Sequence, residues 1–200
     1  MRILALDATG ARCAAGIFED GALRAEAWEP MDRGHAERLF ALIDAALSQA
    51  RVRRRDIEAI AVATGPSGFT GARIGVAAAR GLALGLGAPA VGAQWLEALG
   101  HGVAGACLVA LPASGGVAAQ RFRDGFPLGP PELMEADDPR LVCAPGETRL
   151  GPEALATAGL APLARFVAER VRQGGAPAPA PLYLRPPDAA PSAHAPAPRI

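Results

Sequence analysis

A glycine-rich loop at residues 65–75 is the part of this sequence whose residue types could bind a phosphate. It reads Gly-Pro-Ser-Gly-Phe-Thr-Gly-Ala-Arg-Ile-Gly and follows an apolar stretch, 60–64. Glycine lets the backbone approach another group closely, and a helix that begins there presents unpaired N–H groups to an anion. No lysine follows the last glycine, and the spacing is not G-x-G-x-x-G, so a Walker A loop and a dinucleotide fingerprint are both excluded. The loop therefore predicts either an anion site or a close packing contact.

Regular apolar patterns around this loop predict the elements that hold it. The first ninety or so residues give three strands, a helix, a strand, a second helix and a short strand, in that order. Asp20-Gly21 is a hairpin signal between two of the strands. The first helix, from about His35 to Ala50, has one apolar face, and Phe40 widens it, which favours a larger core over a partner surface. This order is typical of a mixed sheet with helices on its faces.

The second half of the chain has weaker patterns. They predict a short helix, three strands and a terminal helix, at 94–99, 106–111, 117–122, 140–143 and 162–172. Residues 174–181 form a Pro/Ala-rich linker, 182–185 a short extended piece, and 186–200 contain too few apolar residues to fold.

Composition narrows the range of functions. The formal charge is zero at pH 7, so no overall electrostatic attraction for RNA is expected. All basic residues are arginines, and the run at 51–55 is interpreted as a solvated helix end. Three separated cysteines without C-x-x-C spacing exclude a disulfide framework and a zinc site. Asp7 interrupts the apolar start, so no signal peptide is expected, and Arg80 breaks the apolar segment 74–92; we expect a cytoplasmic protein without a membrane span.

The first strand and the loop together carry a family resemblance. Asp7 ends the first strand before the small residues Ala8-Thr9, which resembles the first phosphate motif of the actin, sugar-kinase and Hsp70 superfamily. Joined to His35-Ala36-Glu37-Arg38-Leu39 and to the loop, this pattern is similar to the TsaB (YeaZ) family, non-catalytic partners in bacterial threonylcarbamoyl-adenosine synthesis on tRNA. The resemblance covers residues 1 to about 100 and returns at Leu182-Tyr183-Leu184-Arg185.

The resemblance implies an α/β fold of two ribonuclease-H-like lobes, as in actin-like ATPases, with the second lobe reduced. The expected boundaries are 1–93 for the first lobe, which carries the partner-binding helices, 94–173 for the smaller lobe, and 174–200 for a Pro/Ala-rich tail.

The resemblance also shows what this chain lacks. Catalytic relatives carry two histidines four residues apart on the first helix, where both can hold one metal ion. Here His35 has the first position and Leu39 the second, so no metal site is expected. ATP-using relatives need an acidic phosphate loop in the second half, but 111–117 contains no Asp, and Ser114 has no His and Asp placed to activate it. No catalytic residue is assigned.

Five residues are candidate nucleotide contacts, and each has a structural alternative. Asp7 and Thr9 could form a turn in which the carboxylate bonds nearby N–H groups, or keep a magnesium or water contact of the superfamily. Gly65, Gly68 and Gly71 could expose a helix N-terminus to an anion, or allow close packing against a partner helix. The resemblance requires no cofactor, and ATP or ADP at a subunit interface is the one considered.

The function implied by the resemblance is that of a non-catalytic scaffold in synthesis of N6-threonylcarbamoyladenosine (t6A) beside the tRNA anticodon. It would bind and support a TsaD-type transferase; a TsaE-type ATPase would join, tRNA would be met only through the complex, and the chain alone would form a homodimer. The alternatives are a nucleotide-binding regulator and, from another class, a metallopeptidase or small-molecule kinase.

The expected partner surface is the pair of helices at 35–50 and 71–86, stacked on the same helices of the partner. Its candidate residues are His35, Leu39, Leu42, Ile43, Phe69, Thr70, Arg73, Val76 and Arg80.

Overall fold

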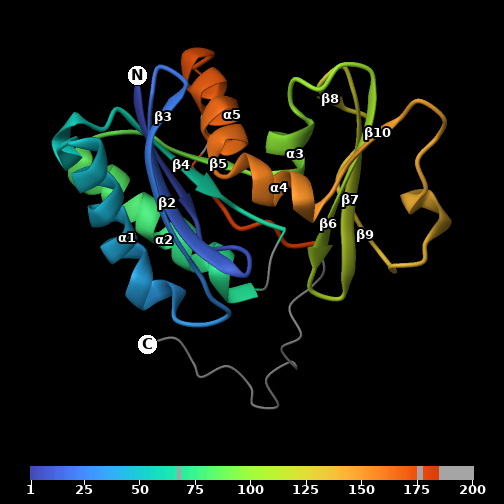
Figure 1. The fold of residues 1–200 in the computed structure, drawn as a ribbon, viewed down its shortest axis with the longest axis horizontal. Coiled ribbons are helices and arrows are strands. Elements are labelled where there is room, and N and C mark those ends of the chain that lie inside the picture. Colours follow the sequence, from blue (N-terminus) through green and yellow to red (C-terminus); the bar gives the residue numbers. More distant parts are fainter. Residues whose placement is uncertain (67–68, 175–177, 185–200) are drawn as a thin grey trace, which may run out of the picture.

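The first lobe is built on a five-stranded sheet in the order β3-β2-β1-β4-β5 (Figure 1). The computed structural model describes residues 1–66, 69–174 and 178–184 of the chain, without the side chain of Phe69. The strands are β1 Arg2–Asp7, β2 Arg12–Glu19, β3 Ala22–Pro30, β4 Ala59–Ala63 and β5 Ala90–Ala93. β1, β2 and β3 are antiparallel neighbours, whereas β4 and β5 run parallel to β1.

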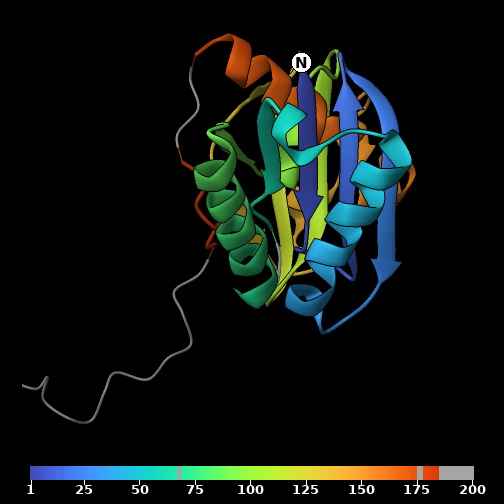
Figure 2. The same ribbon diagram turned by 90° about the vertical axis from the view of Figure 1, so that its left-hand side faces the viewer.

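Helices cover both faces of this sheet, which explains why β4 and the inner residues of β1, Ile3 to Leu6, are apolar on both faces. On one face lie α1 (His35–Ala50) and α2 (Phe69–Leu86), side by side in Figure 2. They pack on the side chains that alternate toward them, such as Leu4, Leu6, Ile60 and Val62. On the other face lies α5 (Ala161–Arg172), which packs against β1, β4 and β5 although it comes from the far end of the chain.

The second lobe repeats the strand order of the first, but most of its strands are short. Its sheet has the order β10-β6-β7-β8, and β9 also pairs with β7. The strands are β6 Ala106–Ala113, β7 Gly116–Arg123, β8 Phe126–Pro127, β9 Glu132–Met134 and β10 Thr148–Leu150. β7 is antiparallel to β6 and β10 is parallel to it, as β2 and β4 are to β1. Within the described residues no strand follows β10 in this sheet, so the lobe is a shortened ribonuclease-H-like unit.

Short helices join and cap the two lobes. They are η1 (Arg54–Asp56), α3 (Trp95–Gly100), η2 (Pro139–Leu141) and α4 (Pro152–Ala158). α3 packs against α5, β6 and β7, and a shared core runs between the lobes from Phe18 through Trp95 to Phe122. Among the described helices none is both long and apolar enough to cross a membrane.

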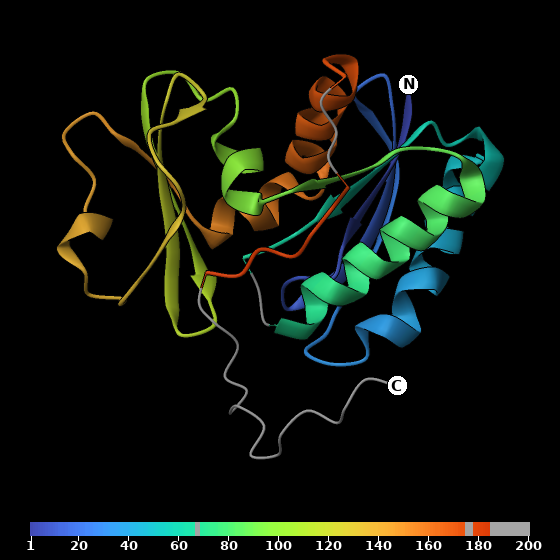
Figure 3. The same cartoon turned by 180° about the vertical axis from the view of Figure 1, so that it is seen from behind.

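Residues 178–184, here called the C-terminal strap, return to the first lobe after α5. The Leu182 amide donates to the Thr64 carbonyl at 2.8 Å. Arg80 Nε donates to the carbonyl of Pro179 at 2.9 Å, and Arg73 Nε to the hydroxyl of Tyr183 at 2.8 Å. In Figure 3 the strap (red) runs beside α2 toward the second lobe, so it links the carboxyl end of β4 to the side of α2.

The expected fold class and the element order of the first lobe are confirmed, and the second lobe contains corrections. The strand expected at 140–143 is wrong, because Arg140 and Leu141 lie in η2, whose N-cap is the side chain of Asp138. Both β10 and α4 were missed.

Candidate functional site

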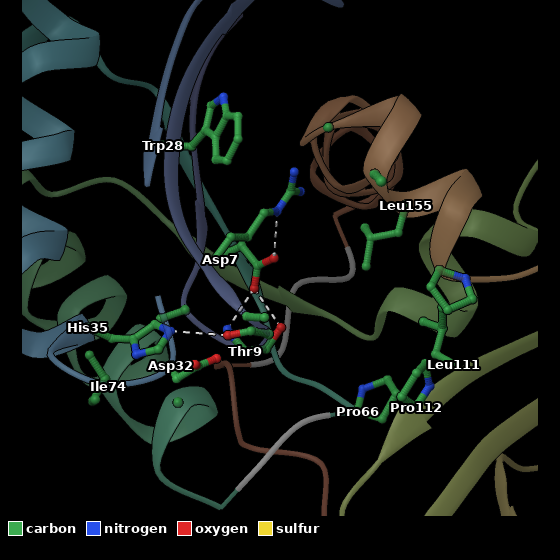
Figure 4. A pocket seen from close by; sticks show the side chains of 18 of the residues that line it. Asp7, Thr9, Trp28, Asp32, His35, Pro66, Ile74, Leu111, Pro112 and Leu155 are labelled. Atoms are coloured by element: carbon green, nitrogen blue, oxygen red, sulfur yellow. Dashed lines mark hydrogen bonds and ion pairs between the residues drawn. The ribbon is translucent and has the colours of Figure 1, made fainter. Parts of the chain in front are cut away.

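A cleft of about 1360 Å³ lies between the two lobes and is the candidate ligand site. Its walls come from the end of β1, from β3, from the start of α2, from the end of β6 and from α4. Figure 4 shows Asp7, Thr9 and His35 on one side of the cavity and Pro112 and Leu155 on the other. The cleft therefore brings together residues from both halves of the chain.

Asp7 lies at the floor of the cleft and its carboxylate is already engaged. The side chain is only 1% exposed, and its Oδ1 accepts hydrogen bonds from the Thr9 amide, at 2.8 Å, and from the Thr9 hydroxyl. Arg12 Nε lies 3.7 Å from Oδ2. This is the turn arrangement in which an aspartate bonds the backbone two residues on. The described residues contain no group of three His, Cys, Asp or Glu side chains placed to hold a metal ion.

His35 and Cys13 fill the space beside this turn. The Nε2 of His35 hydrogen bonds to the carbonyl of Gly10 at 3.1 Å, and the ring is 8% exposed. Burial, followed by the nearby charge of Asp7, raises the pKa of the Cys13 thiol to about 11. Cys13 is therefore a protonated thiol at neutral pH and a poor nucleophile. Leu39 is fully buried one turn after His35 and supplies no second ligand.

The glycines of the loop serve packing. A Cβ added to Gly71 would lie 2.1 Å from the carbonyl oxygen of Ala8, and one added to Gly75 would lie 3.2 Å from Val62 Cγ2. Glycine at these positions lets the start of α2 touch the turn after β1. Gly65 has a φ of +123° and its carbonyl accepts from the Trp95 amide at 2.8 Å. Gly71 and Thr70 line the cleft, whereas Gly68 lies outside the described residues.

Five of the expected partner contacts are in fact buried, at 8% exposure or less. Leu39, Leu42, Ile43 and Val76 pack on the first sheet, and His35 bonds to the Gly10 carbonyl beside the cleft. The physical reason is that the apolar stripe which makes a helix amphipathic is the stripe that the sheet buries. A surface partner cannot reach these side chains in this fold.

The other expected contacts lie at the surface or outside the description. Thr70, Arg73 and Arg80 are exposed, and both arginines bind the C-terminal strap. The Phe69 side chain lies outside the described residues. Phe40, for which core was favoured, is instead 47% exposed on the outer side of α1.

The outer side of α2 has a feature that the sequence analysis missed. Ala77, Gly81, Leu84 and Gly85 are exposed along it, and Leu84 is 89% exposed. A Cβ added to Gly81 or Gly85 would meet nothing within 4 Å. The signal was present in the sequence as two glycines four residues apart near the end of a helix.

Comparison with protein families gives one partial match. The family model described as "TsaD: tRNA N6-adenosine threonylcarbamoyltransferase" matches residues 29–119. The matched segment begins in β3, contains α1 and α2, and ends in β7.

Two sequence relatives differ in how much of the chain they cover. The tRNA threonylcarbamoyladenosine biosynthesis protein TsaB of Escherichia coli is 36% identical over 102 residues, which are 51% of this chain and 44% of that protein. This chain therefore matches less than half the length of that relative. The uncharacterized protein Rv3421c of Mycobacterium tuberculosis is 34% identical over 212 aligned positions, covering 96% of this chain and 95% of that protein.

A solved structure has the same fold over nearly the whole chain. YeaZ from Pseudomonas aeruginosa superposes with a TM-score of 0.72 at 21% identity, covering 92% of this chain and 99% of that one. At this identity the likeness establishes the two-lobed fold.

Proposed function

Because the chain is TsaB-like (YeaZ-like) and belongs to one family with Rv3421c over nearly its full length, we propose that it takes part in t6A biosynthesis. Its role there is that of a non-catalytic scaffold that binds a TsaD-type transferase. A TsaE-type ATPase joins the same complex, and tRNA is met only through it.

The observation that carries the scaffold role is the pair of outward-facing glycines on α2. Glycine inside a helix costs roughly 0.5–1 kcal/mol relative to alanine. At Gly75 the close contact with the sheet offsets this cost, but Gly81 and Gly85 face open space. With Ala77 and the exposed Leu84 they form an apolar strip on the outer side of α2, bordered by the exposed Arg73 and Arg80. Because no side chain projects from Gly81 and Gly85, the backbone of another helix can approach this strip closely.

A TsaD-type partner suits this face because it resembles the chain itself. The family model for TsaD matches the segment that contains α1 and α2, so a TsaD-type protein would present equivalent helices. Equivalent helices pack on each other about an approximate two-fold axis, as in a four-helix arrangement. In isolation, the same face of a second copy would substitute and give a homodimer.

The residues of the cleft support a non-catalytic role for this chain. Asp7 is held by Thr9 and Arg12, Leu39 stands where a second histidine would be needed, and the turn at 111–117 contains no acid. The rival functions, a metallopeptidase or a kinase, need the groups that are missing. A nucleotide-binding regulator is the second candidate, favoured by the size of the cleft, but four acidic and two basic side chains line it, which opposes a polyanion.

The test is light scattering after size exclusion of the chain alone and with a TsaD-type protein, followed by a threonylcarbamoylation assay on tRNA. We expect a one-to-one complex that is active only when both are present. Gly81→Gln should prevent the complex, whereas Gly129→Gln, at an open position of the second lobe, should not. Activity of this chain alone would overturn the scaffold role, and a complex that tolerates Gly81→Gln would overturn the assigned surface. Titration with ATP separates the regulator from the scaffold.

A further inference from the structure

The C-terminal strap carries the only tyrosine of the chain, Tyr183. Its side chain is 47% exposed, but it is held in one orientation. The hydroxyl accepts a hydrogen bond from Arg73 Nε at 2.8 Å, and the guanidinium carbon of Arg73 lies 5.5 Å from the centre of the ring. An exposed ring that is already ordered loses little conformational entropy when another surface covers it.

Packing holds the strap against the first lobe in addition to its hydrogen bonds. Pro179 is buried, and a Cβ added to Gly92 of β5 would lie 3.1 Å from Pro179 Cβ. Leu184 packs against the shared core between the lobes. These contacts lie on both sides of Tyr183 in the sequence, so they fix the place at which its ring is presented.

Tyr183 lies next to the apolar strip of α2. In Figure 3 α2 lies between the strap (red) and α1, and the strap accordingly contacts β5 and the end of β4, whereas α1 packs on β2 and β3. Arg73, Ala77, Arg80 and Leu84 follow one another at three- and four-residue steps, so they form one exposed row along α2. The row spans roughly 16 Å of the helix axis. Because Tyr183 is bonded to the first residue of this row, its ring extends the strip at the end where α2 begins.

The residue types at this end of the strip are those that carry binding energy in protein interfaces. Tyrosine and arginine are, with tryptophan, the most enriched among such residues. Tyrosine offers an apolar ring to a neighbour while its hydroxyl keeps a polar partner, here Arg73. The strap also lies outside residues 29–119, the segment that the TsaD family model matches. It therefore adds a contact from this chain to the helices that the two proteins would have in common.

We propose that the C-terminal strap forms part of the partner surface, and that Tyr183, held by Arg73, packs against the helix of a TsaD-type protein that lies on α2. This inference rests on the proposed scaffold role and extends it, because the surface then combines two segments that are 110 residues apart in the sequence. The partner covers the ring only when the strap is in place. Docking of the strap and binding of the partner therefore stabilise each other.

The first experiment is hydroxyl-radical footprinting of the full chain, alone and with a TsaD-type protein, read by mass spectrometry. We expect oxidation of Tyr183 and of Leu84 to fall severalfold in the complex, because a facing helix covers both side chains. Phe126, which is 75% exposed on the second lobe, is the internal control and should be oxidised equally in both samples.

The footprint separates this inference from the scaffold role. Protection of Leu84 without protection of Tyr183 would overturn the part of the strap and leave the scaffold role standing. Absence of any complex would overturn both. Protection of Tyr183 that grows with the concentration of the chain alone, and does not change when the TsaD-type protein is added, would make a second copy the occupant and overturn the choice of partner.

Calorimetry with substituted chains measures what the ring contributes. Tyr183→Ala should weaken the complex at least about tenfold, as expected for an interface hot spot. Tyr183→Phe keeps the ring and should bind nearly as tightly as the native chain. Phe126→Ala is the matched control, because it removes an exposed ring outside the surface, and it should bind like the native chain. Equal affinity of Tyr183→Ala and the native chain would contradict the proposal.

Hydrogen exchange at the Leu182 amide shows whether the strap of Tyr183→Ala still bonds to Thr64. Weaker binding with unchanged exchange supports a direct contact of the ring with the partner. Weaker binding with faster exchange means that this variant has lost the docked strap as a whole, and the footprint of Tyr183 in the native complex then decides.

Discussion

The two halves of α2 use the same residue type for opposite purposes. Gly71 and Gly75, in the first half, face the sheet, and a Cβ on either would press on the turn after β1 or on Val62. Gly81 and Gly85, in the second half, face open space. The first pair allows the close packing of α2 on the sheet, most tightly at Gly71, whereas a Cβ at either residue of the second pair would contact nothing in the described chain. The difference shows that glycine content alone does not separate a packing contact from a docking surface.

The largest effect on stability is expected at Gly71. Gly71→Ala would place a Cβ 2.1 Å from a backbone oxygen, which cannot move as a side-chain end can. We expect a loss of about 3 kcal/mol of unfolding free energy, near the upper end of the cost of overpacking. For a chain of this size that lowers the melting temperature by roughly 6–12 °C. Thermal unfolding followed by circular dichroism measures it, and an unchanged melting temperature would contradict the close contact.

In the second half of α2, a bulky substitution should weaken partner binding and not the stability of the chain. Gly85→Gln should not lower the melting temperature of the chain and should raise it slightly, because the side chain enters solvent and glutamine is a better helix former than glycine. It should weaken the complex with a TsaD-type protein at least about tenfold, since a close helix contact cannot admit it. Isothermal titration calorimetry of the two proteins checks both the loss and the stoichiometry. Equal affinity for the native and variant chains would place the partner elsewhere.

The same half should be stabilised by a smaller substitution. Replacing Gly81 and Gly85 together by Ala should raise the unfolding free energy of the isolated chain by about 1–2 kcal/mol, because alanine restricts the unfolded backbone and meets no obstacle here. Denaturant titration provides the measurement. A destabilised double variant would mean that these glycines have an internal role.

The smallest effect is expected at the C-terminal strap. It tests whether the contact between Arg73 and the strap stabilises the fold. Tyr183→Phe removes the hydroxyl that accepts from Arg73 but keeps the ring beside the guanidinium, 5.5 Å from its centroid. We expect a loss of about 0.5–1 kcal/mol, the usual value of one exposed hydrogen bond. Hydrogen exchange at the first turns of α2 should quicken in the variant, whereas exchange at Leu84 and beyond should stay the same.

The elements of the first lobe could be predicted because their patterns are long and uniform. β1 and β4 are apolar on both faces, and α1 repeats its apolar residues over sixteen positions. In the second lobe the strands expected at 106–111 and 117–122 are confirmed as β6 and β7, but the other strands gave no such signal. β9 and β10 have three residues each and contain Glu132 and Arg149, so they form through pairing with β7 and β6 and not through a pattern of their own.

The residues of the cleft were predictable only where they belong to a short motif that can be recognised in the sequence. The prediction singled out Asp7, Thr9 and Gly71, and the structure places all three at the cleft. Glu26 and Trp28 were not considered as site residues, because the wall opposite them is α4, more than a hundred residues later and itself not predicted. For the partner surface the apolar stripe misled the prediction, since it marks the buried side of a helix.

The position of α5 sets the order in which this protein can be completed during synthesis. When a ribosome has released only the five strands of the first sheet, α1 and α2 can cover one face, but Ile3, Ala61 and Val91 on the other face still lack α5. That face remains apolar and open until residues 161–172 have left the exit tunnel, and Leu182 can bond Thr64 only later still. The nascent chain therefore carries an exposed apolar sheet from the release of Ala93 until the release of Arg172, the condition in which chaperones engage a chain and in which premature termination yields aggregation-prone fragments.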